Sequence, residues 1–391
     1  MARFGGYSDC DDAAPGQSMK IAIVVPGGVD RTGTHNVIPC LLWLIERLAA
    51  TNEVHVFALQ QEPRPGSWDL LGARVQNAGT RPRRLRALID LVAEHRRGRF
   101  DVVHAWWAGG PGLVAAMFKR LARVPVVLTL PGGDLVGLRD IGYGAQLFWR
   151  GRVATRVAIR AADRVVVPSR WMQDQATAAG IGSVRIPLGV ALDRWPITQP
   201  KRRPADRPLR LVHVANLNRV KDQSTLLEAM RILRDRGIPF RLDVVGLDTL
   251  DGAIQRQSEQ MGLATFMHFH GFHPHSATRR WVEEADLMVV SSRHETVPLV
   301  TVEAAVAGVP TVGTAVGIIA DWSPDAAVAV PVGDSAALAE AIMALAADEE
   351  RRLSLARASQ QRALAEDADV TAARTLALYR ELSRPDYQAV R

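Results

Sequence analysis

Short apolar segments alternate with longer helical patterns through most of the chain, and this alternation limits the fold more than any other feature. In the first half, six segments are short, apolar and mostly bounded by Gly, Pro or polar residues, as strands are. Strands that alternate with helices form βαβ units, which build a parallel sheet covered by helices on both faces. The predicted strands are 21–25, 54–59, 101–104, 124–130, 164–168 and 183–187, with helices such as 37–50 and 82–95 between them.

A segment rich in Pro and charge interrupts the pattern and predicts a linker at residues 196–208 (PITQPKRRPADRP). The alternation then restarts and predicts a second domain of similar size. We therefore expect an α/β protein with two doubly wound Rossmann-like domains, at 19–195 and 209–391, whose ligand-binding strand ends face one cleft. Residues 1–18 are polar and Gly-rich, which predicts a disordered leader. In the second domain the predicted strands are 209–215, 241–245, 267–270, 287–291, 311–313 and 328–331, and the predicted helices are 224–236, 250–261, 277–285, 302–307, 335–347 and 349–364.

Composition excludes several other classes of protein. With 391 residues, 48% hydrophobic and 23% charged, the chain has the mix of an ordinary globular protein of about two domains. Every long uncharged stretch is broken by Gly and Pro, so none is a credible membrane span. Only two cysteines occur, Cys10 and Cys40, which are too few for a disulfide framework or a zinc site. We expect a reducing, cytoplasmic location.

The net charge of +7 is unevenly distributed. Residues 1–195 hold 25 Lys and Arg but 16 Asp and Glu, a balance of +9, and the rest of the chain is slightly acidic. A basic surface favours phosphates or anionic lipid. The 81–99 segment carries Leu85, Ile89 and Val92 at helical spacing beside its arginines, so it predicts contact with an anionic membrane. In the alternative, these apolar residues face the core and the arginines form a solvated helix face. Aromatic residues are not interleaved with the arginines, so we expect no nucleic acid.

The most informative segment is 291–314 (SSRHETVPLVTVEAAVAGVPTVGT). A buried strand ends in a polar turn that contains Glu295, and a helix follows whose first turn contains Glu303, eight residues later. A helix N-terminus suits a phosphate, and carboxylates on either side suit sugar hydroxyls. The segment is therefore a candidate site for a nucleoside diphosphate. In the alternative, Glu303 only complements the helix dipole and Glu295 is a solvated loop residue.

At this point the sequence resembles a known family. Glu295 and Glu303 match the E-x7-E element of the retaining, nucleotide-sugar-dependent glycosyltransferases of the GT-B type, family GT4 (glycosyl transferases group 1). The resemblance extends from Lys20 to about Leu382, in the order and spacing of its motifs. It implies a GT-B fold, with an acceptor-side N-terminal domain and a donor-binding C-terminal domain. The last helix of the C-terminal domain can pack back on the N-terminal domain. Further matching segments are 214–229 (VANLNRVKDQSTLLEA), 163–169 (DRVVVPS) and 186–193 (IPLGVALD).

The resemblance implies roles for individual residues. Glu303 is expected to bind the ribose hydroxyls, Glu295 to contact the donor sugar, and Lys221 to neutralise the diphosphate. Asp134 is a candidate contact to the acceptor, and we name it as catalytic together with Glu295 and Lys221. The remaining donor-binding candidates are Gly27, Gly28, Asn216, Arg219, Gly271, Phe272, Thr296, Leu299 and Val300.

Two positions depart from the family's pattern. Asn216 stands where the family usually has an Arg that acts with Lys221, and Arg219 is a nearby substitute. Pro131 stands where the family often has a His, in the segment 129–134 (TLPGGD). These departures keep open a nucleotide-sugar-binding protein without transfer activity, and a GT-B-type sugar-nucleotide epimerase is a further alternative. A dehydrogenase is disfavoured because no G-x-G-x-x-G follows the first predicted strand.

The expected partners are a nucleoside diphosphate-sugar donor, with UDP or GDP as the nucleotide, and a glycan, lipid-linked or small-molecule acceptor. We expect no metal ion and no cofactor, because neither Asp-x-Asp triplet, Asp9/Asp11 or Asp367/Asp369, follows a predicted strand at the cleft. Four histidines lie close together, and His268 and His270 share one face of a predicted strand. No nearby Cys or carboxylate completes a metal site there, so we interpret this pair as structural.

Overall fold

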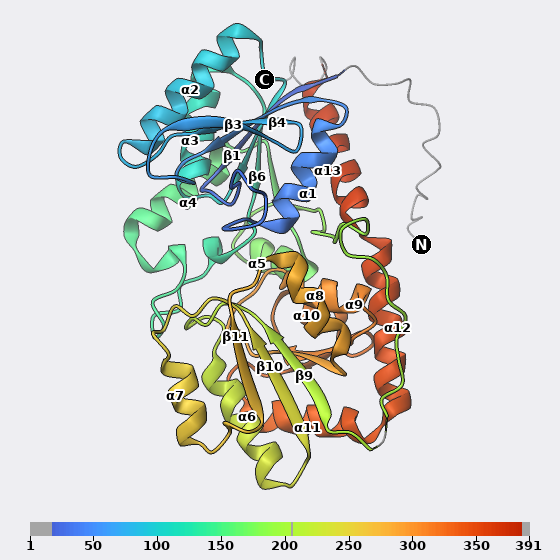
Figure 1. Ribbon diagram of the computed structural model, residues 1–391. Helices are drawn as coiled ribbons and strands as arrows, with labels where there is room; N and C mark the ends of the chain where they lie inside the picture. Colours follow the sequence, from blue (N-terminus) through green and yellow to red (C-terminus); the bar gives the residue numbers. More distant parts are fainter. Residues whose placement is uncertain (1–17, 205, 385–391) are drawn as a thin grey trace, which may run out of the picture.

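Two open sheets, one above the other in Figure 1, organise the chain. The computed structural model describes residues 18–204 and 206–384, so the predicted leader lies outside the described residues except for Ser18. The first sheet has eight strands in the order β3-β4-β2-β1-β5-β6-β7-β8, and all neighbours are parallel except β3 and β4. Its strands are β1 (Lys20–Val25), β2 (Glu53–Ala58), β3 (Gly66–Leu70), β4 (Ala73–Asn77), β5 (Val102–Trp106), β6 (Val126–Thr129), β7 (Arg164–Val167) and β8 (Val184–Arg185).

Burial on both faces explains why these strands are continuous apolar runs. In β1 the side chains of Ile21 and Ile23 enter a core on one face of the sheet, and Ala22 and Val24 enter a second core on the other. A strand buried on both faces gains nothing from polar alternation, so its sequence is apolar throughout. The covering helices are α1 (Pro39–Ala49), α2 (Arg83–Arg97), α3 (Gly110–Ala122), α4 (Trp149–Ala161) and α5 (Arg170–Ala178), with short 3-10 turns at Gly133–Leu135 and Ala145–Leu147.

The hairpin of β3 and β4 was not predicted. It stands at the edge of the sheet, where only one face is buried, so its strands alternate between exposed and buried side chains. Leu71 and Gly72 connect the strands, and both have positive φ, as the turn of a tight two-residue hairpin requires.

The second sheet has six strands, all parallel, in the order β11-β10-β9-β12-β13-β14. The strand order reverses at β9, which lies between β10 and β12, and ligands bind at such a switch point in open α/β sheets. The strands are β9 (Leu209–Val214), β10 (Phe240–Val245), β11 (Met267–Gly271), β12 (Leu287–Val290), β13 (Thr311–Thr314) and β14 (Val328–Val330), and the helices are α6 (Gln223–Asp235), α7 (Ala253–Gln260), α8 (His275–Glu284), α9 (Leu299–Val306), α10 (Gly317–Trp322), α11 (Ser335–Ala347), α12 (Glu349–Ala365) and α13 (Ala368–Ser383).

Four helix starts, those of α1, α7, α8 and α9, differ from the prediction by two or three residues, and two of them have a local reason. Helix α7 begins at Ala253 instead of residue 250, because the Asp248 carboxylate accepts hydrogen bonds from the amides of Leu250 and Gly252 and holds these residues in a turn. Helix α8 begins at His275, directly after Pro274, which ends the preceding extended segment.

The last two helices run along both halves of the molecule. Helix α12 packs against α9 and α11 of the second half, whereas α13 packs against α1 and β5 of the first (Figure 1). Tyr379 of α13 is fully buried, and its hydroxyl lies 2.6 Å from Nδ1 of His104 in β5. Residues 196–204 form the other connection between the halves and contain no helix or strand. Within the described residues, no helix has the length and apolar character needed to cross a membrane.

Candidate active site

A groove of about 370 Å³ lies at the carboxyl ends of β9, β10 and β12, the switch point of the second sheet. Residues that follow these strands, such as Asn216 and Gly246, line it together with the first turn of α9. Pro39, the first residue of α1, lines it from the first half of the chain. The groove is therefore built by both halves, as the sequence predicts for a ligand cleft.

An ion pair between Lys221 and Glu295 lies in this groove. Lys221 follows β9, and the next residue, Asp222, caps helix α6 by accepting a hydrogen bond from the amide of Thr225. Glu295 lies in the loop between β12 and α9, where the hydroxyl of Ser292 donates to its Oε1 at 2.7 Å. The lysine and the carboxylate are 23% and 13% exposed, so both remain reachable by a ligand.

Glu303 is buried in the first turns of α9, with 2% of its surface exposed. Its Oε1 lies 2.5 Å from Nε2 of His275, the first residue of α8. Burial would lower the pKa of His275, but the Glu303 carboxylate outweighs burial and raises this pKa above its ordinary value. The rings of Trp43 and Trp195 lie 5.5 Å and 5.0 Å from the His275 ring, so two side chains of the first half pack against a histidine of the second.

The first turn of α9 offers backbone donors to the groove. Leu299 and Val300 line it, and no side chain caps this helix, which starts after Pro298. The first amides of a helix lack partners within the helix and carry its positive dipole end. Amides, Lys221 and the two carboxylates together can hold an anion and, beside it, hydroxyl groups.

The loop after β6 closes the side of the site that faces the first sheet. The hydroxyl of Thr296 donates to the carbonyl of Pro131 at 2.6 Å, which ties this loop to the segment that holds Glu295. Asp134 is 4% exposed; its Oδ1 accepts from the amide of Ala108 at 2.9 Å, while its Oδ2 has no partner among the described residues. Burial raises the pKa of Asp134 to about 6.

Tyr143 is a buried phenol near the carboxylates of Asp134 and Glu295. Burial, with smaller contributions from the Glu295 and Asp134 carboxylates, raises the pKa of Tyr143 to about 12. Both carboxylates therefore act on the same phenol, although Asp134 does not line the groove itself.

Comparison with known proteins identifies the family. Residues 195–362 match the model described as "Glycosyl transferases group 1", and residues 37–189 match the "Glycosyl transferase 4-like domain". The chain is 30% identical over 318 residues to D-inositol 3-phosphate glycosyltransferase 1 of Catenulispora acidiphila, covering 72% of each protein. The chain belongs to the group 1 glycosyltransferases.

Other relatives agree with this assignment. The glycosyltransferase is 26% identical over 386 residues to a glycogen synthase of Mycobacterium tuberculosis, covering 96% of this chain and 89% of the relative. Its fold superposes with a TM-score of 0.80 on sucrose-phosphate synthase of Thermosynechococcus elongatus, at 21% identity and covering 93% and 99% of the two chains. The predicted fold class, two Rossmann-like domains of the GT-B type, is thereby confirmed.

Several donor-binding candidates of the glycosyltransferase lie elsewhere or have other partners. Arg219 is exposed and is not among the residues that line the groove. Asn216 lines it, and its Oδ1 accepts from the amide of Leu247 at 3.1 Å. Phe272 also lines it, half exposed, directly after Gly271 at the end of β11.

The glycine loop after β1 is occupied by a side chain of its own domain. Oε1 of Gln61 accepts from the amides of Gly28 and Val29 at 2.6 and 2.9 Å. A Cβ on Gly28 would lie 2.4 Å from Ile38, and its φ is +85°, so this position requires glycine. Gly27 lies beside Gln60 and Gln61, and neither glycine lines the groove.

The sequence interpretation did not find the role of His275. The four clustered histidines separate in the structure. Nε2 of His270 lies 2.7 Å from Asp243 on the neighbouring strand, whereas His273 and His275 line the groove. No local spacing signals the pairing of His275 with Glu303, because the two residues are 28 positions apart.

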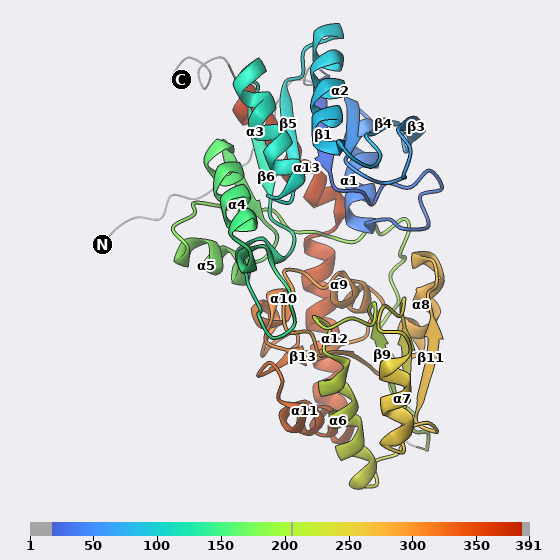
Figure 2. The same ribbon diagram turned by 90° about the vertical axis from the view of Figure 1, so that its left-hand side faces the viewer.

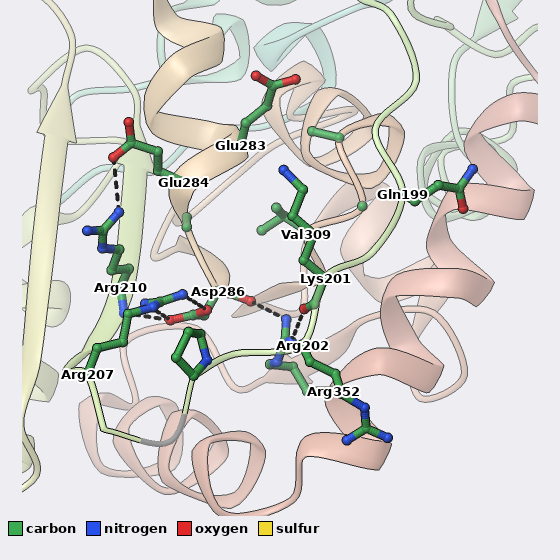
Figure 3. A pocket seen from close by; sticks show the side chains of 14 residues that line it. Gln199, Lys201, Arg202, Arg207, Arg210, Glu283, Glu284, Asp286, Val309 and Arg352 are labelled. Atoms are coloured by element: carbon green, nitrogen blue, oxygen red, sulfur yellow. Dashed lines mark hydrogen bonds and ion pairs between the residues drawn. The ribbon is translucent and has the colours of Figure 1, made fainter.

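Two other features contain clustered charges but lie outside the groove. A second cavity of about 300 Å³ borders the linker, and its charges are largely paired: Arg207 forms a bidentate pair with Asp286, and Arg210 pairs with Glu284 (Figure 3).

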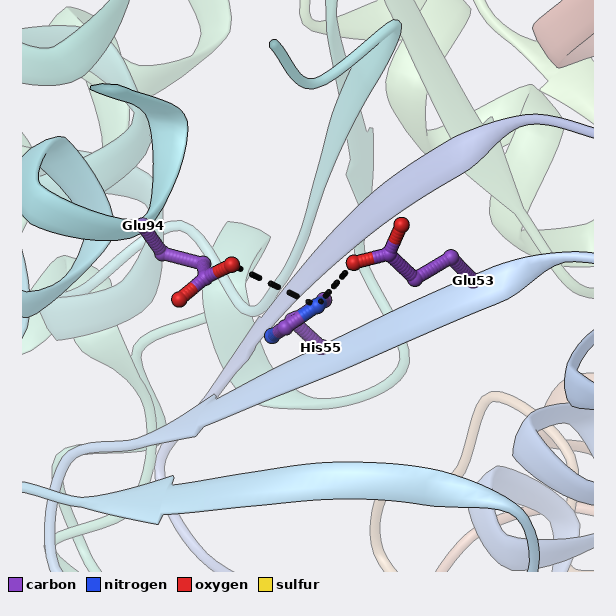
Figure 4. Close-up of side chains that lie close together, drawn as sticks. All are labelled: Glu53, His55 and Glu94. Carbon is purple, nitrogen blue, oxygen red and sulfur yellow. Dashed lines mark hydrogen bonds and ion pairs between the residues drawn. The ribbon is translucent and has the colours of Figure 1, made fainter. Parts of the chain in front are cut away.

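In the first half, Glu53 and Glu94 point toward His55 at a spacing that suits a metal ion (Figure 4). However, the Lys20 amine bonds both carboxylates at 2.9 and 2.8 Å, so an ammonium group already serves as their cation.

Proposed function

We propose that this glycosyltransferase moves a hexosyl group, with retention of anomeric configuration, from a nucleoside diphosphate-sugar to an acceptor hydroxyl. The observation that carries the proposal is the convergence of Lys221, Glu295, Glu303 and the first amides of α9 on one groove. Structures of the HepE protein of Anabaena, which share the fold with TM-scores near 0.7, contain UDP or UDP-glucose. These complexes support a UDP-sugar as the first donor to test, with GDP-sugars as the alternative.

In the proposed mechanism, the bond between the anomeric carbon and the diphosphate breaks, and negative charge develops on the diphosphate oxygens. The acceptor hydroxyl oxygen bonds to the same carbon on the same face, and its proton passes to the departing phosphate oxygen. Lys221 and the amides of Leu299 and Val300 stabilise that charge as fixed donors. Glu295 is released from Lys221 as the diphosphate takes its place, and then faces the positive charge at the anomeric carbon. Glu303 accepts hydrogen bonds from the ribose hydroxyls.

On this proposal the enzyme needs no metal ion, because Lys221 and the dipole of α9 supply the positive charge. Donor turnover should therefore persist in EDTA. A thermal-shift panel of UDP-, GDP- and ADP-sugars identifies the nucleotide, since a ligand at a hundred times its Kd adds about 2.7 kcal/mol of stability. NMR of the anomeric proton of the product then reports retention or inversion.

The Glu295→Gln variant tests transfer against the alternatives. The amide keeps the size of the side chain but removes its charge, so we expect donor binding to persist while donor hydrolysis and transfer fall. An unchanged hydrolysis rate supports a binding protein without transfer activity. Conversion of one sugar-nucleotide to another without acceptor supports an epimerase.

The acceptor class is a glycan, a lipid-linked sugar or a small molecule, and the acceptor is proposed to bind between the groove and Asp134. Two relatives carry names that refer to polysaccharides: a putative colanic acid biosynthesis glycosyltransferase of Escherichia coli and a putative teichuronic acid biosynthesis glycosyltransferase of Bacillus subtilis. They support a role in glycoconjugate synthesis. The cytoplasmic location stays a prediction.

A further inference from the structure

Helices α2, α3 and α4 cover the same side of the first sheet, with α3 packed between the other two (Figure 2). Each of them presents a row of apolar side chains to the solvent, at the i, i+4 spacing of one helix face. We call this surface the three-helix face. Its exposed apolar residues are Leu85 and Ile89 of α2, Met117 and Leu121 of α3, and Phe148, Trp149, Val153 and Val157 at and along α4.

The described part of the chain exposes thirteen large apolar side chains, and eight of them lie on this surface. Exposed apolar side chains are therefore concentrated on the three-helix face. The two sequence interpretations of α2 differ in where its apolar residues point, and the structure divides them. Leu85 and Ile89 are 54% and 56% exposed, so they do not face the core, whereas Val92 packs against it.

The three-helix face is strongly cationic. Helix α4 contains four arginines and no acidic residue, and α3 contributes Arg120, whereas the Lys119 amine pairs with Asp163. Helix α2 contains five arginines against Asp90 and Glu94, and Glu94 is buried and bonded to Lys20 and Arg97, so the helix remains cationic. Arg156 and Arg160 of α4 pair with no carboxylate among residues 18–204 and 206–384.

A groove of about 410 Å³ runs along α4 beside this surface, on the side of the helix that faces residues 179–181. Arg152, Arg156 and Arg160 line it beside the apolar side chains of Ile159 and Ile181. The hydroxyl of Thr155 also lines it; this residue is 3% exposed, and its oxygen has no hydrogen-bond partner among the described residues. The groove thus combines cations, an unpartnered hydroxyl and an apolar floor, which suits an anionic group attached to a hydrocarbon chain.

We propose that the three-helix face docks on the surface of an anionic lipid bilayer, with one headgroup phosphate in the α4 groove. A bilayer fits better than a folded partner, because the apolar residues stand in separate rows on three helices and α4 also carries four arginines without an acidic residue. Arginine stems and an interfacial Trp insert among headgroups in this arrangement. The guanidinium of Arg150 lies 5.4 Å from the centre of the Trp149 ring, at the helix end nearest the active site.

This inference goes beyond the proposed function, since binding to a bilayer requires neither donor nor acceptor. Failure of vesicle binding would leave the transfer proposal intact, and failure of transfer would leave vesicle binding intact.

The test is co-sedimentation of the whole chain with vesicles of phosphatidylglycerol and phosphatidylcholine, against vesicles of phosphatidylcholine alone. We expect binding to the anionic vesicles only, and loss of binding near 1 M salt, where the Debye length falls to about 3 Å. The triple variant Arg152→Gln/Arg156→Gln/Arg160→Gln should lower the partition coefficient on the order of a hundredfold. The matched control changes three exposed arginines of the second half, Arg256, Arg351 and Arg357, to Gln and should leave it unchanged.

If the triple variant does not fold, Arg156→Gln alone should lower binding about fivefold. Equal partitioning between the two kinds of vesicle would overturn the proposal, as would an equal loss in the control. A dimer in solution that the triple variant dissolves, without vesicle binding by the parent chain, would also overturn it and assign the face to a second copy of the chain.

Discussion

The Nε2 atom of His275 lies 2.5 Å from the Oε1 atom of Glu303, so the buried carboxylate of the groove has a partner whose charge depends on pH. Glu303 is also the residue that we propose to bind the ribose. A donor must therefore share this carboxylate with His275 or take it over.

The pair predicts a dependence of stability on pH. The pKa of His275 is raised in the folded protein, which means that the protonated ring stabilises the fold. This stabilisation is fully present below the ordinary pKa of about 6.5 and is lost as pH rises through the raised value. The His275→Gln variant lacks this titration. We expect the difference in Tm between wild type and variant to be largest near pH 6 and to shrink at alkaline pH. A difference in Tm that stays constant with pH would show that His275 contributes by packing alone. Glu303→Gln is the control: in this background the difference in Tm should no longer depend on pH.

Lys221→Ala should weaken donor binding. A charge-assisted hydrogen bond to the diphosphate contributes about 1.5–3 kcal/mol, which corresponds to roughly ten- to a hundredfold in Kd, measured by calorimetry with UDP. Arg219→Ala is the matched control, because it removes a nearby exposed cation that does not line the groove. Equal effects of the two variants would mean that the diphosphate lies outside the groove.

Asp134→Asn should stabilise the fold while it lowers transfer. The pKa of Asp134 is raised to about 6 when folded, so its ionised form destabilises the protein at pH above about 6, and this penalty disappears below the ordinary pKa. Denaturant unfolding near pH 8 should show a gain of about 1–3 kcal/mol for the variant, which fades toward pH 4. Lower stability near pH 8 would indicate that the carboxylate Oδ2 has a favourable partner. An unchanged kcat would exclude Asp134 from the reaction.

Asn216→Arg should leave donor affinity equal or improve it up to about tenfold, since it adds a second cation to the groove. The bond from the amide of Leu247 is lost, but water can replace it because Asn216 is exposed. Asn216→Ala separates the two effects by removing the bond without adding charge. A large loss of affinity in the Arg variant alone would assign a specific role to the amide.

Sequence periodicity predicted both sheets because their strands are buried on both faces and therefore apolar throughout. It failed for β3 and β4, whose exposed face makes them polar and whose turn at Leu71 and Gly72 contains no Asn or Asp signal. Helix ends were misplaced where a single side chain, such as Asp248, takes the first amides.

The candidate site was predictable where its residues share one local segment. Glu295, Leu299, Val300 and Glu303 follow one strand, so the local sequence brings them together. His275 and Gln61 could not be assigned in this way, because only the tertiary fold brings each of them near its partner. His275 bonds the Glu303 carboxylate, and Gln61 bonds the amide of Gly28.

Helix α13 has a consequence for the order in which the protein is made. Tyr379 and Leu382 of this helix complete the core of a sheet whose last strand ends at Arg185. At roughly 5–20 residues per second, the ribosome needs on the order of ten to forty seconds to synthesise the chain between them. During that interval one face of the first sheet lacks part of its cover, so the first domain reaches its final packing only after the second has been translated. If the chain is truncated before α13, the first domain should be the part that aggregates, although it lies far from the cut in sequence.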